Sequence, residues 1–95
     1  MFNRIASLIE PILPELTTFR RDLHSHPELS RQEHRTSEKI RAALAKLPKL
    51  KVLPALTGTD VVAVLNADKP GRCIGIRADI DALPIQEQTG VEYQS

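Results

Sequence analysis

Apolar residues recur every three or four positions between residues 5 and 23, which predicts an amphipathic helix whose apolar side packs into a core. Pro11 and Pro14 lie inside this stretch, so we expect a short leading turn and then a main helix that starts near these prolines. Pro27 disfavours a helical residue before it, so the main helix should end around His24–His26. The apolar positions are Ile5, Leu8, Ile9, Ile12, Leu13, Leu16, Phe19 and Leu23.

A second helix is predicted to begin at Ser30. Ser30 with Glu33 three residues later is the pattern of a capping box, and Pro48 should close the helix. Its inner face would carry Ile40, Ala43, Leu44 and Leu47. Its outer face would carry Arg31, Arg35, Glu38, Lys39, Arg41 and Lys46.

Three strands are predicted after the helices, over residues 50–56, 61–65 and 72–84. The first is weakened by Pro54, the second is apolar throughout, and the third alternates apolar with polar or small residues. The turns between them are short, which favours antiparallel neighbours. The sequence therefore predicts an α/β fold of two N-terminal helices followed by three strands. Two helices cannot cover both faces of this sheet, so we expect it to be the start of a larger α/β domain.

Composition narrows the classes of partner and compartment. The 95 residues make one domain at most, with a net charge of +1 and 3% aromatic residues, which favours neither nucleic acid nor an anionic membrane. No stretch approaches the ~20 apolar residues of a membrane span. Cys73 is the single cysteine and lies in an apolar strand, where it should be a small core residue. We therefore expect a cytoplasmic protein.

Asp79 and Asp81 are the sharpest local candidates for chemistry, because they share one face at the exit of the third strand. One interpretation is structural, with solvated carboxylates and an ion pair to Arg77. A second is a phosphatase of the haloacid-dehalogenase type, in which the first Asp attacks phosphorus and magnesium is bound. A third is a metallohydrolase in which an Asp braces a metal-binding histidine.

The histidines and one glutamate near the end of the first predicted helix are weaker candidates for a metal-binding or catalytic role. His24-Ser25-His26 resembles a metal-binding His-x-His pair, but residues two apart at a helix end point away from each other, and the helix dipole accounts for histidine there. His34 is predicted to be a solvated helix residue. Glu28 should accept hydrogen bonds from free backbone N–H groups at the start of the second helix.

Several blocks in order resemble the N-terminus of the M20 metallopeptidase family, in its amidohydrolase branch of N-acyl-amino-acid amidohydrolases, hippurate hydrolases and auxin-conjugate hydrolases. The resemblance covers about residues 15–95 and displaces the phosphatase interpretation. The matching blocks are FRRDLHSHPELS (19–30), EHRT (33–36), GTDVVAVL (58–65) and GRCIGIRADIDALPI (71–85).

The resemblance implies that residues 1–95 are the N-terminal part of an M20-type catalytic domain, with the rest of that domain and a lid or dimerisation domain outside them. It implies a divalent metal pair of zinc, manganese, cobalt or nickel, whose ligands lie beyond Ser95. Asp79 stands where the wider family has a histidine ligand, so we assign no metal ligand in this chain. Asp81 stands where the family has the Asp that orients an imidazole ligand, and it is our catalytic-site residue.

The implied reaction is hydrolysis of the amide bond in N-acyl amino acids, with hippurate-like or auxin-conjugate-like substrates. The implied partner is that small-molecule substrate, and the full-length enzyme is expected to be capable of forming homo-oligomers. The isolated 95 residues are expected to be inactive. The alternative is a catalytically inactive, truncated remnant or a non-enzymatic interaction module.

Overall fold

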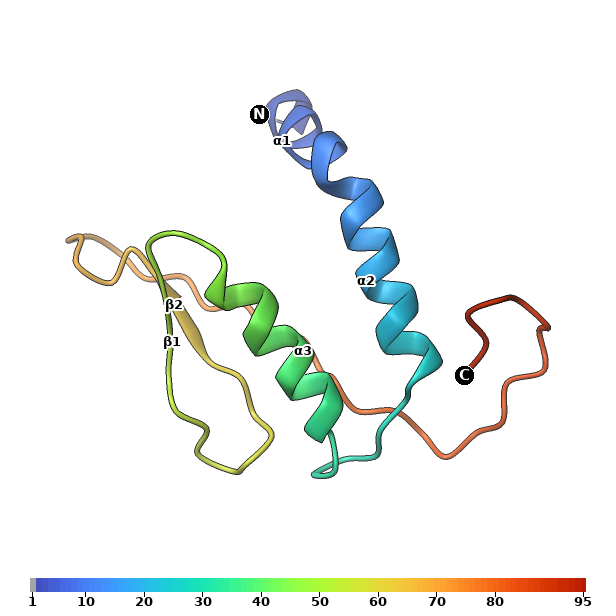
Figure 1. Ribbon diagram of the computed structural model, residues 1–95. Coiled ribbons are helices and arrows are strands. Elements are labelled where there is room, and N and C mark those ends of the chain that lie inside the picture. Colours follow the sequence, from blue (N-terminus) through green and yellow to red (C-terminus); the bar gives the residue numbers. More distant parts are fainter. Residues whose placement is uncertain (1) are drawn as a thin grey trace. The chain divides into compact units, whose positions relative to one another are not determined.

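The structure is a computed structural model that describes residues 2–95, and the chain divides into two compact units (Figure 1). The first unit combines the N-terminal helices, as far as residue 26, with residues 85–95. The second unit contains residues 27–84. The elements agree with a small α/β fragment: helices are followed by a short antiparallel sheet.

The first unit is built on helix α1 (Phe2–Ile9), a single 3₁₀ turn η1 (Glu10–Ile12) and helix α2 (Leu13–Ser25). Pro11 and Pro14 each fall in the first two positions of η1 and α2, where the missing N–H breaks no helical hydrogen bond. The predicted start and end of the main helix are therefore confirmed. The segment before it is an eight-residue helix rather than the short turn that we expected.

The second unit contains helix α3 (His34–Ala45) and two strands, β1 (Leu50–Val52) and β2 (Ala63–Leu65). The strands pair antiparallel, as predicted, with Lys51 opposite Val64. α3 lies against β1, beside the hairpin in Figure 1. Both strands are shorter than the stretches from which they were predicted, and only three residues of each are paired. The sheet between residues 2 and 95 holds only these two strands.

The prediction of a capping box at Ser30 was wrong. α3 begins at His34 and its N-cap residue is Glu33. The Glu33 side chain accepts no capping hydrogen bond from the helix. A turn delays the helix: the Gln32 N–H donates to the Leu29 carbonyl at 2.9 Å, and Arg31 takes a left-handed φ of 68°. Helical geometry cannot pass through that left-handed residue.

The third predicted strand is absent from the described chain. Residues 72–84 run without strand pairing (orange in Figure 1), and Ile74 and Ile76 are 85% and 95% exposed. Cys73 is also exposed, so its predicted place in a core was wrong. Period-2 alternation is not sufficient for a strand, which also needs backbone partners along its length and cover for its apolar face.

Arg41 was assigned to the solvated face of the second helix, and the structure corrects this. Its Nη1 donates to the Leu53 carbonyl at 3.0 Å, and its Nη2 donates to the Asp60 carbonyl at 2.7 Å. The guanidinium thus joins α3 to the chain on either side of the hairpin loop. Ile40 and Leu44 are half-buried as predicted, whereas Leu47 is 53% exposed.

Full burial of residues 2–95 is confined to four polar or charged residues. No apolar residue of this range is fully buried, and the residues that are buried are Glu33, Thr36, Ser37 and Thr59. The expectation that the first apolar stripe packs into a core therefore fails within the described chain. None of the helices in this range has the length and apolarity needed to cross a membrane.

Candidate functional site

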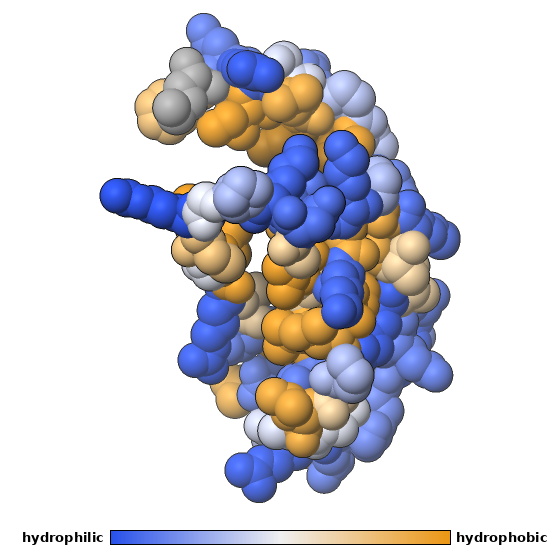
Figure 2. All heavy atoms as spheres, turned by 90° about the vertical axis from the view of Figure 1, so that its left-hand side faces the viewer, coloured by the Kyte–Doolittle hydropathy of each residue, from blue (hydrophilic) through white to orange (hydrophobic). Residues whose placement is uncertain are grey.

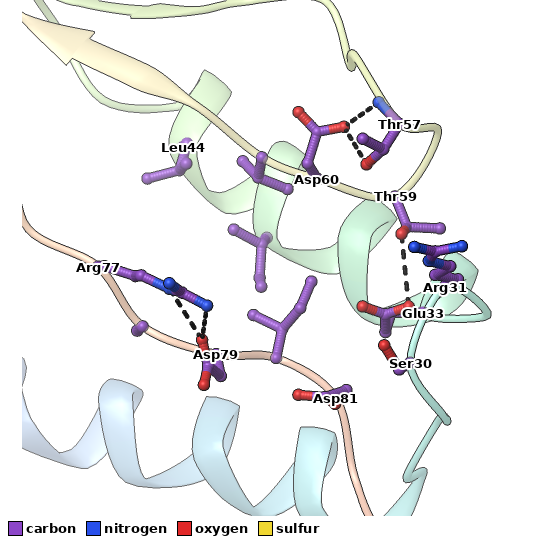
Figure 3. A pocket seen from close by; sticks show the side chains of 14 residues that line it. Ser30, Arg31, Glu33, Leu44, Thr57, Thr59, Asp60, Arg77, Asp79 and Asp81 are labelled. Carbon is purple, nitrogen blue, oxygen red and sulfur yellow. Dashed lines mark hydrogen bonds and ion pairs between the residues drawn. The ribbon is translucent and has the colours of Figure 1, made fainter.

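A cavity of about 580 Å³ lies in the second unit, between α3, the loop of residues 57–61 and the segment 77–81 (Figure 3). Small-molecule sites in proteins commonly have volumes of ~300–1,000 Å³ and combine an apolar lining with a few polar groups. The apolar lining includes Ile40 and Leu44 from α3. The charged lining residues are Arg31, Glu33, Asp60, Arg77, Asp79 and Asp81.

Asp60 closes the loop at one side of this cavity. Its carboxylate accepts a hydrogen bond from the Leu56 N–H (3.2 Å). It also accepts hydrogen bonds from the Thr57 N–H (2.7 Å) and the Thr57 hydroxyl (2.9 Å), which Figure 3 shows. The backbone N–H groups of Thr57 and Leu56, together with the Thr57 hydroxyl, lower the pKa of Asp60 to about 2. This carboxylate is therefore ionised and held by its own loop, so it is poorly suited to act as a base.

Replacing Thr57 with valine should raise the pKa of Asp60 from about 2 toward its ordinary value of 3.8. The rise should be partial, because valine removes the hydroxyl donor and leaves both backbone donors in place. Titration of the Asp60 carboxyl carbon by NMR in the variant and in the unmutated chain measures this rise in pKa. Thr59→Val is the matched control, since the Thr59 hydroxyl bonds to Glu33 instead. An unchanged Asp60 pKa in Thr57→Val would contradict the assigned role of the hydroxyl.

Glu28 has the role that was predicted for it. Its Oε2 accepts from the Arg35 N–H at 3.0 Å and its Oε1 from the Thr36 N–H at 2.6 Å, two of the free donors in the first turn of α3. Burial raises the pKa of the Glu28 carboxyl, but the hydrogen bonds from Thr36 and Arg35 outweigh it, so the pKa lies below its usual value of 4.5. Glu28 supplies the capping acceptor that was wrongly expected from Ser30.

Glu33 and Thr59 form a polar contact in the cavity wall that sequence reasoning missed. Glu33 is 8% exposed and Thr59 is 5% exposed, and the Thr59 hydroxyl lies 3.4 Å from Glu33 Oε1 (Figure 3). The residues are 26 positions apart, so no local spacing signals the pair. The available signal was Thr59 within the turn-forming Thr57–Asp60 segment, which indicated a loop but not its partner.

Asp79 and Asp81 both line the cavity, but their surroundings differ. Asp79 Oδ1 lies 3.1 Å from both Nε and Nη2 of Arg77, the ion pair predicted by the structural interpretation, and both side chains are exposed. Asp81 is also exposed and precedes Ala82, whose N–H donates to the Glu28 carbonyl at 2.8 Å. That bond anchors the backbone beside Asp81. The catalytic role of Asp81 stays a prediction.

His24 belongs to a separate cluster in the first unit. Its Nε2 lies 3.1 Å from Glu87 Oε1, and its ring meets the Tyr93 ring edge to face with centroids 5.9 Å apart. The Arg21 guanidinium stacks on the same Tyr93 ring at 4.5 Å. Hydrogen bonds from the Ser95 N–H and from His24 outweigh burial and hold the pKa of Glu87 below its usual value. The cluster joins α2 to residues 85–95.

The described histidines do not form a metal pair. His26 Nδ1 lies 3.0 Å from the Asp22 carbonyl and 3.0 Å from Ser25 Oγ, while His24 faces Glu87. His34 is exposed on α3, as predicted. Within residues 2–95 no three His, Cys, Asp or Glu side chains are grouped to hold a metal ion. The residues present therefore do not fit the metal pair that the family resemblance implies.

Comparison with curated proteins finds relatives that are named as an amidohydrolase, a deacetylase and a carboxypeptidase. The chain is 42% identical over 93 residues to the N-acyl-L-amino acid amidohydrolase of Geobacillus stearothermophilus, covering 98% of this chain and 25% of that protein. It is 50% identical over 82 residues to an N-acetylcysteine deacetylase of Bacillus subtilis, covering 84% of this chain and 21% of that protein. It is 40% identical to thermostable carboxypeptidase 1 of Saccharolobus solfataricus, covering 100% and 24% respectively.

These names fit the M20 family that the sequence resembles. The chain spans about a quarter or less of the length of each of these relatives. No family model matches the chain. No solved structure matches it either.

Proposed function

We propose that this chain is part of a hydrolase that cleaves the amide bond of N-acyl amino acids. The observation that carries the proposal is the 42% identity to an N-acyl-L-amino acid amidohydrolase over almost the whole of this chain. The 50% identity to an N-acetylcysteine deacetylase supports it, because that name also denotes removal of an acyl group from an amino acid.

The finer proposal is that the chain is the N-terminal piece of an M20-type enzyme of the amidohydrolase branch. Its substrates would be hippurate-like or auxin-conjugate-like N-acyl amino acids. The enzyme would act in the cytoplasm. The full-length protein would form homo-oligomers. We assign the divalent metal pair of the whole enzyme to side chains outside these 95 residues, because those within residues 2–95 do not fit one. The isolated chain should then be inactive.

Asp81 is the residue of this chain that we place beside the reacting centre, as a positioning residue for a metal-binding imidazole supplied by the rest of the enzyme. Three features support this. Asp81 lines the cavity, its carboxylate is exposed rather than held by its own loop as Asp60 is, and the adjacent backbone is anchored by the bond from Ala82 to Glu28. A carboxylate that accepts the second N–H of a ligating imidazole fixes the tautomer and the ring orientation.

A pair of chimeras tests the proposed activity. Residues 1–95 replace the matched region of the Geobacillus amidohydrolase in the first chimera and of the Bacillus N-acetylcysteine deacetylase in the second. We expect both chimeras to release free amino acid from N-acetyl and N-benzoyl amino acids, and the chain alone to release none. Chimeras that fold, by circular dichroism and gel filtration, but hydrolyse no N-acyl amino acid would favour an inactive remnant or an interaction module.

A further inference from the structure

One face of the N-terminal helices carries large aliphatic side chains that no residue of the described chain covers fully. The exposed fractions of these side chains range from 42% to 65%. Within each helix their spacing of three or four residues places them on one side, with Ile12 in the 3₁₀ turn between the helices. We call this set the apolar stripe. It consists of Ile5, Leu8, Ile9, Ile12, Leu13 and Leu16.

A continuous apolar stripe has a different meaning from scattered exposed residues. Single exposed apolar side chains are normal on protein surfaces, whereas a contiguous patch marks a contact surface. Figure 2 shows apolar surface over α1, at the top of the view. Asn3 and Ser7 are exposed positions of the same helix outside this set, so α1 is amphipathic. Such a helix is stabilised in proteins chiefly by packing of its apolar side.

The lengths of the relatives indicate what covers the stripe. Saccharolobus carboxypeptidase 1 matches 100% of this chain, so the counterpart of the stripe is inside the matched region, which is only 24% of that protein. The Geobacillus amidohydrolase matches 98% of the chain with 25% of its own length. In each of these two relatives about three quarters of the polypeptide lies outside the matched region and is available to bury this surface.

We infer that the apolar stripe is the docking surface for the remainder of the hydrolase, the part that corresponds to the unmatched three quarters of these relatives. This inference rests on the proposed function. The partner surface should present aliphatic side chains to the stripe, with charged groups at its edges that complement Arg4 and Glu15, which are exposed on these helices. Docking would turn a half-exposed stripe into part of a core.

Two double variants in the Geobacillus chimera test the inference. Ile5→Gln with Leu8→Gln removes two aliphatic side chains from the stripe, and Asn3→Gln with Ser7→Gln makes the same number of changes to the same residue type elsewhere on α1. Glutamine is a good helix former, so the helix itself should persist in both variants. Urea unfolding of each chimera, and circular dichroism of each isolated chain, are the measurements.

We expect the stripe variant to raise the unfolding equilibrium constant of the chimera by about 10–100-fold, since roughly half the surface of two large aliphatic side chains is left to bury on docking. The control variant should change it by no more than about twofold. The isolated chains should keep equal helix content. Equal urea midpoints for the stripe variant and the control variant would overturn the inference. Aggregation of both unmutated chimeras, the Geobacillus one and the Bacillus one, would also overturn it.

Other occupants of the stripe give different results, each of which overturns the inference. A second copy of the chain would show as a dimer in sedimentation equilibrium that the stripe variant abolishes, with the chimera unaffected. Binding of the isolated chain to phosphatidylcholine vesicles, again lost only in the stripe variant, would indicate a membrane surface. Loss of helix in the isolated stripe variant would mean that the chain covers the stripe itself.

The inference and the proposed function fail separately. A chimera that the stripe variant destabilises, but that hydrolyses no N-acyl amino acid, supports the docking surface and contradicts the function. A chimera that hydrolyses these substrates with equal stability in both variants supports the function and contradicts the docking surface.

Discussion

Replacement of Asp81 by asparagine in the chimeric hydrolase should lower kcat/KM by roughly 10–100-fold, the usual cost of removing a group that orients a metal-ligating imidazole. Asparagine keeps the size of the side chain and removes its charge, so the exposed position should tolerate it structurally. The loss should fall on kcat or on metal content, because the residue acts through the position of a ligand rather than by contact with the substrate.

Asp79→Asn is the matched control for this prediction, since Asp79 lines the same cavity and its ion pair with Arg77 is exposed. Exposed ion pairs contribute little to stability, so this variant should keep its melting temperature and its activity. Metal content by mass spectrometry and thermal unfolding complete the comparison. Full activity and full metal content in Asp81→Asn would remove Asp81 from the site, and an equal loss in both variants would indicate a general effect of charge.

Loss of the Glu28 carboxylate should loosen the start of α3. In Glu28→Ala the Arg35 and Thr36 N–H groups lose their acceptor, which we expect to destabilise the first turn by about 1 kcal/mol, the typical value for a helix N-cap. Hydrogen exchange at these two amides should become about fivefold faster. Glu38→Ala removes a carboxylate from an exposed position in the middle of the same helix and should leave both amides unchanged. Equal protection in the two variants would contradict the capping role.

The same contact makes the start of α3 sensitive to acid. The folded pKa of Glu28 lies below its ordinary value of 4.5, so its contribution to stability is complete above that pH and is lost as the pH falls through the folded pKa. The amide chemical shifts of Arg35 and Thr36 should therefore titrate below 4.5. In Glu28→Gln this step should disappear, and its persistence would mean that another group is responsible.

Local signals predicted the features whose partners are close in the chain. Prolines placed the start and end of α2, because their restricted geometry acts on the residues beside them. The ion pair of Arg77 with Asp79 joins residues two positions apart. The role of Glu28 was foreseen for the same reason, since a carboxylate just before a helix meets the free N–H groups of its first turn.

Contacts between distant residues were decided only by the tertiary structure. His24 pairs with Glu87 and Glu33 with Thr59, and no periodicity relates the members of either pair. The sequence placed Arg41 on the solvated face of its helix, whereas in the structure it donates hydrogen bonds to two carbonyl groups next to the hairpin loop. Residues 72–84 are the reverse case, because the sequence predicted a strand there and the structure has none.

That segment has the composition of a strand, but a strand forms only where neighbouring chain supplies hydrogen bonds and cover. The described chain supplies neither, and Ile74 and Ile76 lie exposed. For this protein the sequence by itself determined the bounds of α2, the presence of a second helix after it and the resemblance to amidohydrolases. Which apolar surfaces are buried depends on the chain packed against them, and that was decided by the tertiary structure alone.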